Sequence, residues 1–72
     1  MYVQNKIDIA NNIRAERNRS KITIDKVVEE LRVSKPTYIK YEKNADGIKV
    51  GFLIKLAELF NCKVSDFFYQ KH

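Results

Sequence analysis

The sequence has little of the chemistry that crosslinks, anchors or exports a protein. Its one cysteine, Cys62, cannot form an internal disulfide, which favours a reducing compartment. No apolar run approaches the ~20 residues that a transmembrane helix needs. The stretch "MYVQNKIDIANN" has no apolar core of signal-peptide length. We therefore expect an intact, cytoplasmic protein with no membrane partner.

Catalytic and metal-binding side chains are equally scarce. The single histidine, His72, is the last residue, and a lone cysteine cannot supply a metal site. We find no nucleophile–base pair, no carboxylate dyad and no glycine-rich phosphate loop. The sequence thus predicts no enzyme activity, no metal, no cofactor and no small-molecule ligand.

Positive charge is what the sequence has in excess. The net charge is +5 over 72 residues, which leave room for a single domain, residues 1–72. A small basic domain favours a polyanionic partner, with nucleic acid ahead of an anionic membrane. The charges are also segregated, because residues 22–31 carry three acids and one lysine, whereas residues 32–49 carry five basic residues and two acids.

Helical periodicity dominates the chain, and two glycines and one proline do little to interrupt it. The helical segments are expected at about 7–19, 24–31, 35–43, 50–60 and 64–69. Thr23 and Ser34 can cap the second and third of these, and Pro36 falls in a first turn, where its missing N–H costs nothing. Asn44 can end the third in a left-handed conformation. The sequence predicts an all-α, compact five-helix domain.

The segment "KPTYIKYEK", residues 35–43, has two different faces on a helical wheel. Tyr38 and Tyr41 point inward as anchors, with their hydroxyls near the edge. The outward arc carries Lys35, Pro36, Ile39, Lys40 and Lys43. Such a helix fits the major groove of B-DNA, where lysines can reach phosphates or guanine O6 and N7, and Ile39 can contact a thymine methyl. The alternative is an ordinary solvated face.

Residues 24–43 have helix-turn-helix spacing, with two short helices separated by a tight turn. In that motif the second helix enters the groove while the first crosses the DNA backbone. The start of segment 24–31 can offer free N–H groups to a phosphate, and Thr23 is placed to help.

Three stretches together resemble the Cro/cI-type helix-turn-helix domain, also called the lambda-repressor-like or XRE family. "IANNIRAERNRSKITIDKVVEEL" is similar to its first two helices, "VSKPTYIKYEKN" to its turn and recognition helix, and "LIKLAELFNCKVSDFF" to its last two helices. The resemblance covers about residues 9–68. It implies a transcriptional regulator, repressor-like, that binds double-stranded DNA as a homodimer.

The resemblance also implies roles for particular residues. The base-facing positions are matched by Lys35, Pro36 and Lys40, and the positions near phosphate by Thr37 and Lys43. Together with Thr23 and Ile39, these are the predicted DNA contacts. Arg17 and Glu42 match an ion pair that ties the first helix to the end of the recognition helix.

Several residues depart from the family pattern, among them Ile24, Arg32 and Lys63. Ile24 stands where a glutamine commonly meets a phosphate, which leaves only backbone N–H groups there. Arg32 stands at the turn where glycine is common, so a left-handed backbone would cost about 1 kcal/mol. Lys63 stands where a capping residue such as serine is usual, which predicts fraying of segment 64–69.

The C-terminal part offers an apolar surface with two interpretations. Segment 50–60 is apolar on most sides and is expected to be the central, buried helix. Its outer side could instead join the next segment in an exposed stripe that forms a dimer interface, made of Phe52, Leu59, Phe67 and Phe68. That stripe also supports an alternative function, a protein-interaction module such as an antitoxin-like or anti-repressor partner. Residues 1–6 could pack on the domain or form an arm.

Overall fold

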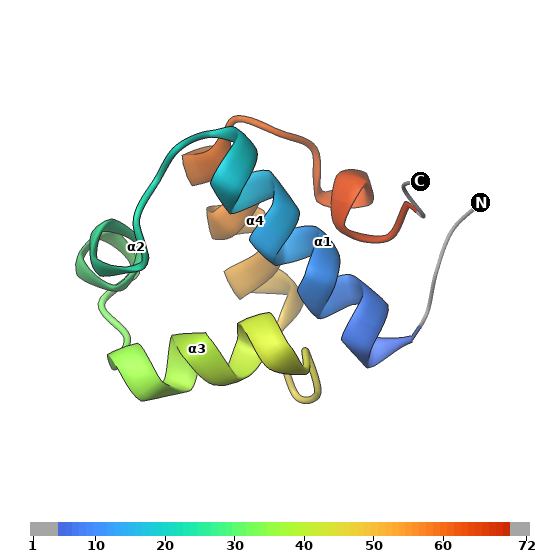
Figure 1. Cartoon of the computed structure of the whole chain (residues 1–72), viewed down its shortest axis with the longest axis horizontal. Coiled ribbons are helices and arrows are strands. Elements are labelled where there is room, and N and C mark those ends of the chain that lie inside the picture. Colours follow the sequence, from blue (N-terminus) through green and yellow to red (C-terminus); the bar gives the residue numbers. More distant parts are fainter. Residues whose placement is uncertain (1–4, 70–72) are drawn as a thin grey trace.

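The computed structural model describes residues 5–69, which form four α-helices and one 3-10 turn. The elements are α1 (Lys6–Arg19), α2 (Ile24–Leu31), α3 (Lys35–Lys43), α4 (Val50–Phe60) and the turn η1 (Val64–Phe67). Figure 1 shows α1 and α4 in the middle, α2 at the left and α3 along the bottom. Because α3 packs against both α1 and α2, and η1 against α1 and α4, the helices enclose one core.

The helix starts follow the predicted caps. The hydroxyl of Thr23 accepts the backbone N–H of Lys26 at 3.1 Å, and that of Ser34 accepts the N–H of Thr37 at 3.3 Å. Pro36 lies in the first turn of α3, as expected. At the other end of the chain, the prediction of five helices is wrong: residues 64–67 form only a 3-10 turn, held by an Asp66 carboxylate that accepts the N–H of Lys63.

The start of the chain and the loop after α3 differ from the prediction. Residues 1–4 of the predicted arm, and His72, lie outside the described residues. The rest of the arm is part of the helix, since Asn5 caps α1 and Lys6 begins it. Asn44 is extended, with φ −156°, and its side chain accepts the N–H of Asp46 at 3.0 Å. The left-handed residue of this loop is Gly47, with φ +78°.

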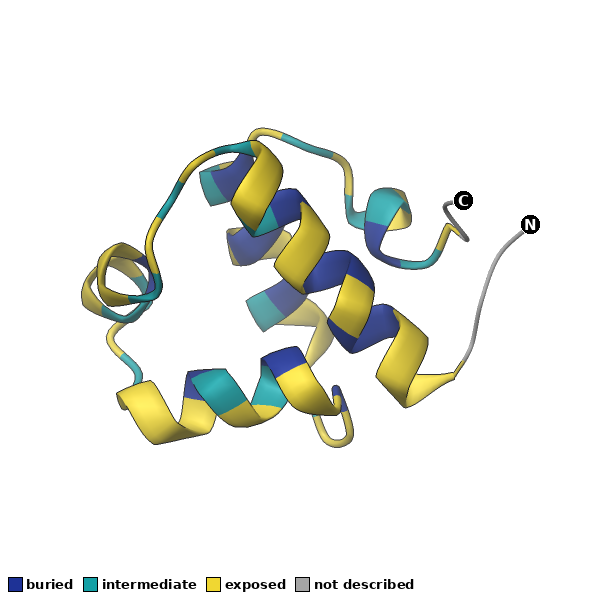
Figure 2. Cartoon of the chain, viewed as in Figure 1, coloured by how far each residue is buried: buried dark blue, intermediate teal, exposed yellow. Residues whose placement is uncertain are grey.

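Each element contributes large side chains to the core, and Figure 2 shows the buried positions along the ribbon in dark blue. The largest fully buried side chains are Tyr38, Phe60, Phe67, Ile13, Leu56 and Val27. Phe60 and Phe67 meet edge to face, with ring centroids 6.4 Å apart. Phe67 is therefore a core residue and cannot belong to the predicted dimer surface. The edge-to-face contact with Phe60 helps to hold the segment after α4 against the core.

The sequence predicted that α4 is buried on most sides, but only one side of this helix faces the core. Leu53, Leu56 and Phe60 face the core, whereas Val50 and Ile54 are 68% and 46% exposed. Phe52 is half-buried, and its ring packs on Tyr41 at a centroid distance of 5.5 Å. Periodicity could not choose between these faces, because nearly every position of the helix is apolar.

Candidate nucleic-acid interface

The unit formed by α2, the turn and α3 is built around one left-handed residue. Arg32 adopts φ +55° and ψ +48° and donates its N–H to the carbonyl of Val28. The next residue, Val33, donates to the same carbonyl at 3.3 Å. The turn is therefore as tight as the sequence predicts, and it is made without glycine at the strained position.

Most of the predicted contact residues lie on one exposed face of α3. Lys35, Pro36, Thr37, Lys40 and Lys43 are exposed, and Ile39 is half-buried. Within residues 5–69, Lys40 and Lys43 make no ion pair, so their ammonium groups are free to meet an anion. Thr37 is partly engaged, since its hydroxyl accepts the hydroxyl of Ser34 at 2.7 Å.

Two predicted residues already have partners at the helix starts. The hydroxyl of Thr23 is exposed but serves as the cap of α2. Lys35 forms an ion pair across the turn with Asp25 of α2, with 2.9 Å between Nζ and Oδ1. Sequence reasoning missed this pair, because a helical wheel describes one helix at a time.

The inner side of α3 is tied to α1 by the ion pair expected between Arg17 and Glu42. Arg17 donates twice to the carboxylate, from Nε to Oε2 at 2.6 Å and from Nη2 to Oε1 at 3.1 Å. The hydrogen bond with Glu42 raises the pKa of Arg17, against the opposing effect of burial. A second arginine, Arg14, donates to the backbone carbonyl of Glu42 at 3.0 Å, a contact that the sequence analysis missed.

Tyr38 also lies on the inner side of α3, where it is fully buried. Its ring is an anchor as predicted, but its hydroxyl is fully enclosed and not at the edge of the domain. The hydroxyl lies beside Arg17 and Glu42 without a hydrogen bond of good geometry to any described residue. Burial, reinforced by Glu42, raises the pKa of Tyr38 far above its usual value.

A model of the helix-turn-helix family of Cro/cI (XRE) type matches residues 13–67, more than half of the chain. The chain belongs to the Cro/cI-type helix-turn-helix family. No curated protein and no solved structure gives a significant match. The matched range runs from the middle of α1 to the last residue of η1, so it includes α2, the turn and α3 whole.

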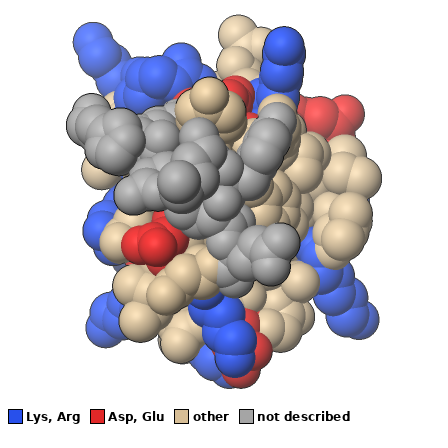
Figure 3. Space-filling model, turned by 90° about the vertical axis from the view of Figure 1, so that its right-hand side faces the viewer, with Lys and Arg blue, Asp and Glu red and all other residues tan. Residues whose placement is uncertain are grey.

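Membership of the XRE family makes this a small DNA-binding domain of a typically non-catalytic kind. Among the described residues, no helix is both long and apolar enough to cross a membrane. Figure 3 looks at the end of the domain away from α2, where basic and acidic side chains both lie around the rim. The exposed face of α3 differs, since its one acid, Glu42, is buried against Arg17.

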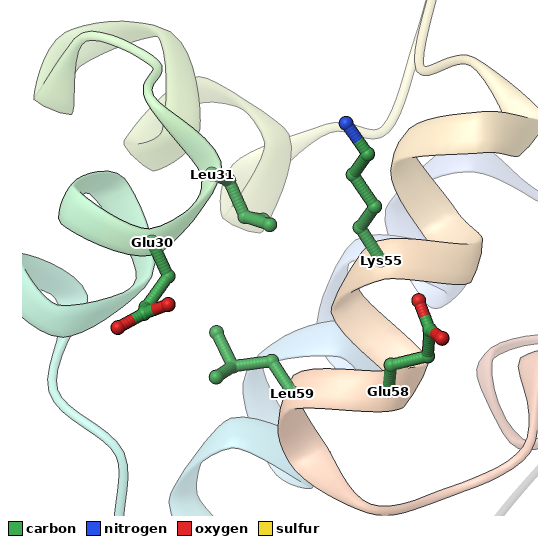
Figure 4. Close-up of a pocket in the computed structure, with 5 residues that line it drawn as sticks. All are labelled: Glu30, Leu31, Lys55, Glu58 and Leu59. Carbon is green, nitrogen blue, oxygen red and sulfur yellow. The ribbon is translucent and has the colours of Figure 1, made fainter.

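The XRE domain also has an open groove of about 460 Å³ between α2 and α4. In Figure 4, Leu31 and Leu59 point toward each other across it, with Glu30, Lys55 and Glu58 around them. Leu59 is thus a half-buried wall of a groove and Phe52 a half-buried partner of Tyr41. Of the four residues of the predicted stripe, Phe67 is thus in the core, and Phe52, Leu59 and Phe68 are half-buried.

Proposed function

We propose that this chain is a sequence-specific, double-stranded DNA-binding transcriptional regulator of the cytoplasm, repressor-like, that places α3 in the major groove. One observation carries the proposal. The three lysines of α3 are exposed, while the only acid of the helix, Glu42, is buried in its ion pair with Arg17. The outward face of α3 therefore carries lysines from its first residue to its last, which suits a groove lined by phosphates.

We also propose that the regulator acts as a homodimer. Two copies related by a two-fold axis can read two half-sites one helical turn, about 34 Å, apart. A dimer doubles the number of phosphates that the lysines of α3 neutralise, so affinity should fall steeply with salt. Sedimentation of the free chain, and of the chain with a selected operator, gives the number of copies. A single copy on an operator would contradict this part of the proposal.

The DNA-binding proposal is tested by fluorescence anisotropy with a labelled mixed-sequence duplex at two salt concentrations. We compare the wild type with a Lys35→Ala/Lys40→Ala variant. A matched control, Lys55→Ala/Lys63→Ala, removes the same charge from exposed lysines outside α3. We expect salt-sensitive binding that drops at least tenfold in the α3 variant. An equal loss of affinity in both variants would mean that the duplex responds to the overall positive charge of the domain and not to α3 in particular.

The groove between α2 and α4 favours one second candidate, a protein-interaction module. Its apolar walls, Leu31 and Leu59, face each other from different helices and are only half-buried. If the wild type binds no duplex even at low salt, while Leu59→Glu abolishes capture of a protein partner, this second function replaces the first.

A further inference from the structure

Asp25 and Lys35 meet where the two helices of the helix-turn-helix unit begin. Asp25 is the second residue of α2 and Lys35 the first of α3, and the carboxylate and ammonium are 2.9 Å apart. The side chains are 77% and 52% exposed, so the pair contributes little to folding. The carboxylate nevertheless lies at the end of α3 that the proposed function turns toward DNA. A negative charge there weakens binding to any phosphate backbone.

The ion pair changes what Lys35 can do. A lysine ammonium is a point charge with three donors on a flexible four-carbon stem, so an unrestrained one can turn to whichever phosphate is nearest. Here one donor is already directed to Asp25. Two donors remain, and the pair biases the ammonium toward a place beside the first turn of α3.

The four bases differ in the hydrogen-bond acceptors that they offer to the two remaining donors of Lys35. In the major groove guanine presents two acceptors, O6 and N7. Adenine presents one acceptor next to an amino donor, cytosine an amino donor, and thymine a single carbonyl oxygen. An ammonium whose third donor is occupied therefore matches guanine best, and it would face a repelling donor on adenine and cytosine.

We infer that Asp25 is a specificity-determining residue, which holds the Lys35 ammonium over the base edges so that this end of α3 selects guanine. The inference rests on the proposed function and deepens it. The carboxylate repels phosphate and restrains the lysine, so it lowers affinity for all DNA but lowers it less where guanine is present. The pair thus exchanges general affinity for sequence preference.

The experiment selects binding sites from a randomised duplex library with four proteins at one salt concentration. They are the wild type, Asp25→Asn, Lys35→Met and, as matched control, Glu29→Gln. Glu29 is an exposed acid of the same helix, and its neutralisation changes the net charge by the same amount. Each protein is also titrated with a mixed-sequence duplex, and circular dichroism checks the fold.

We expect the wild type to enrich a guanine at one position of each half-site, and Lys35→Met to lose it. Asp25→Asn should relax this same position alone. It should also bind the mixed-sequence duplex about fivefold more tightly, the order expected when one charge near 4 Å from a phosphate is removed in water. Glu29→Gln should keep the guanine.

Other results separate the two proposals. If Asp25→Asn keeps the guanine, or changes selection no more than Glu29→Gln does, the role of Asp25 is overturned and the DNA-binding function stands. Enrichment of a different base at the position lost in Lys35→Met also overturns it. If the wild type enriches no sequence, the DNA-binding function itself fails, and the role of Asp25 fails with it.

Discussion

Helix α3 takes part in two ion pairs, one on its inner side and one at its outer end, and the two pairs differ in burial and in the number of contacts. The side chains of Arg17 and Glu42 are 14% and 6% exposed, and two hydrogen bonds join them. The side chains of Lys35 and Asp25 are more than half exposed, and one contact of 2.9 Å joins them. The first pair is enclosed by the domain, whereas the second is open to any ligand.

Burial decides what each pair can be used for. Charges removed from water need partners for all their polar atoms, and Arg17 accordingly also donates to the carbonyl of Ile22 at 3.0 Å. Separating such a pair is therefore costly. The exposed pair can shift at small cost, because water screens both groups, and it leaves two donors of Lys35 open to a base. The inner pair therefore orients α3, and the outer pair is available for recognition.

Breaking the inner pair should have the largest effect on stability. Glu42→Ala leaves the half-buried Arg17 without its acceptor, which should lower the free energy of unfolding by about 3–5 kcal/mol. Glu42→Gln keeps the volume and one acceptor and should lose less. Urea unfolding followed by circular dichroism measures both, with Glu29→Gln as an exposed control that should stay within about 0.5 kcal/mol. A loss below about 1 kcal/mol for Glu42→Ala would show that the pair is not what orients α3.

The inner pair and the helices that carry it could be predicted from the sequence because each depends on local signals. Thr23 and Ser34 mark helix starts by their own hydroxyls, and Arg17 shares one side of a helical wheel with Ile9 and Ile13. The family resemblance then supplies Glu42 as its partner. These predictions need only one helix at a time, or one known pairing between two helices.

What the sequence could not predict depends on how separate helices meet. The pair between Lys35 and Asp25 requires the angle between α2 and α3, which the residue pattern does not contain. The exposure of Val50 and Ile54 depends on which apolar face of α4 the other helices cover. The place of Phe67 depends on a 3-10 turn that leads the chain back to Phe60, and periodicity treated this segment as another helix.

The hydroxyl of Tyr38, which lies beside the inner pair, should make the stability of the domain depend on pH. Burial raises the pKa of Tyr38 in the folded state above its unfolded value of about 10. The folded state then keeps its proton where the unfolded state loses it. This contribution to stability is full below about pH 10 and falls by about 1.4 kcal/mol for each further pH unit. Urea unfolding between pH 8 and 11 should show a steeper alkaline loss in the wild type than in Tyr38→Phe.

The neutral-pH result of the same variant is a further check. The hydroxyl is buried without a hydrogen bond of good geometry to a described residue, so Tyr38→Phe removes an unsatisfied group and should raise the free energy of unfolding at pH 7 by about 1 kcal/mol. Parallel pH curves for the two proteins would mean that the hydroxyl reaches water in the folded state.

A substitution in the turn between α2 and α3 should change the free energy of unfolding less than the loss of the inner pair does. Arg32→Gly relieves a left-handed residue at φ +55°, and we expect a gain of about 1 kcal/mol in the free energy of unfolding. Asn61→Gly is the matched control, since Asn61 has φ +54° but asparagine tolerates this conformation. Its gain should be smaller. Equal gains, measured by thermal unfolding, would mean that the arginine is not strained more than the asparagine.

Breaking the outer pair should have the smallest effect on stability. A double-mutant cycle with Asp25→Ala and Lys35→Ala isolates the pair from the favourable place of Asp25 at the start of α2. We expect a coupling energy of about 0.2–1 kcal/mol at low salt, which falls toward zero at 1 M salt. The coupling between Arg17 and Glu42, from an equivalent cycle, should change little over the same range, because their side chains are shielded from the ions. If both couplings respond to salt alike, burial is not what separates the two pairs, and the division of α3 into an orienting side and a recognising end would have to be given up.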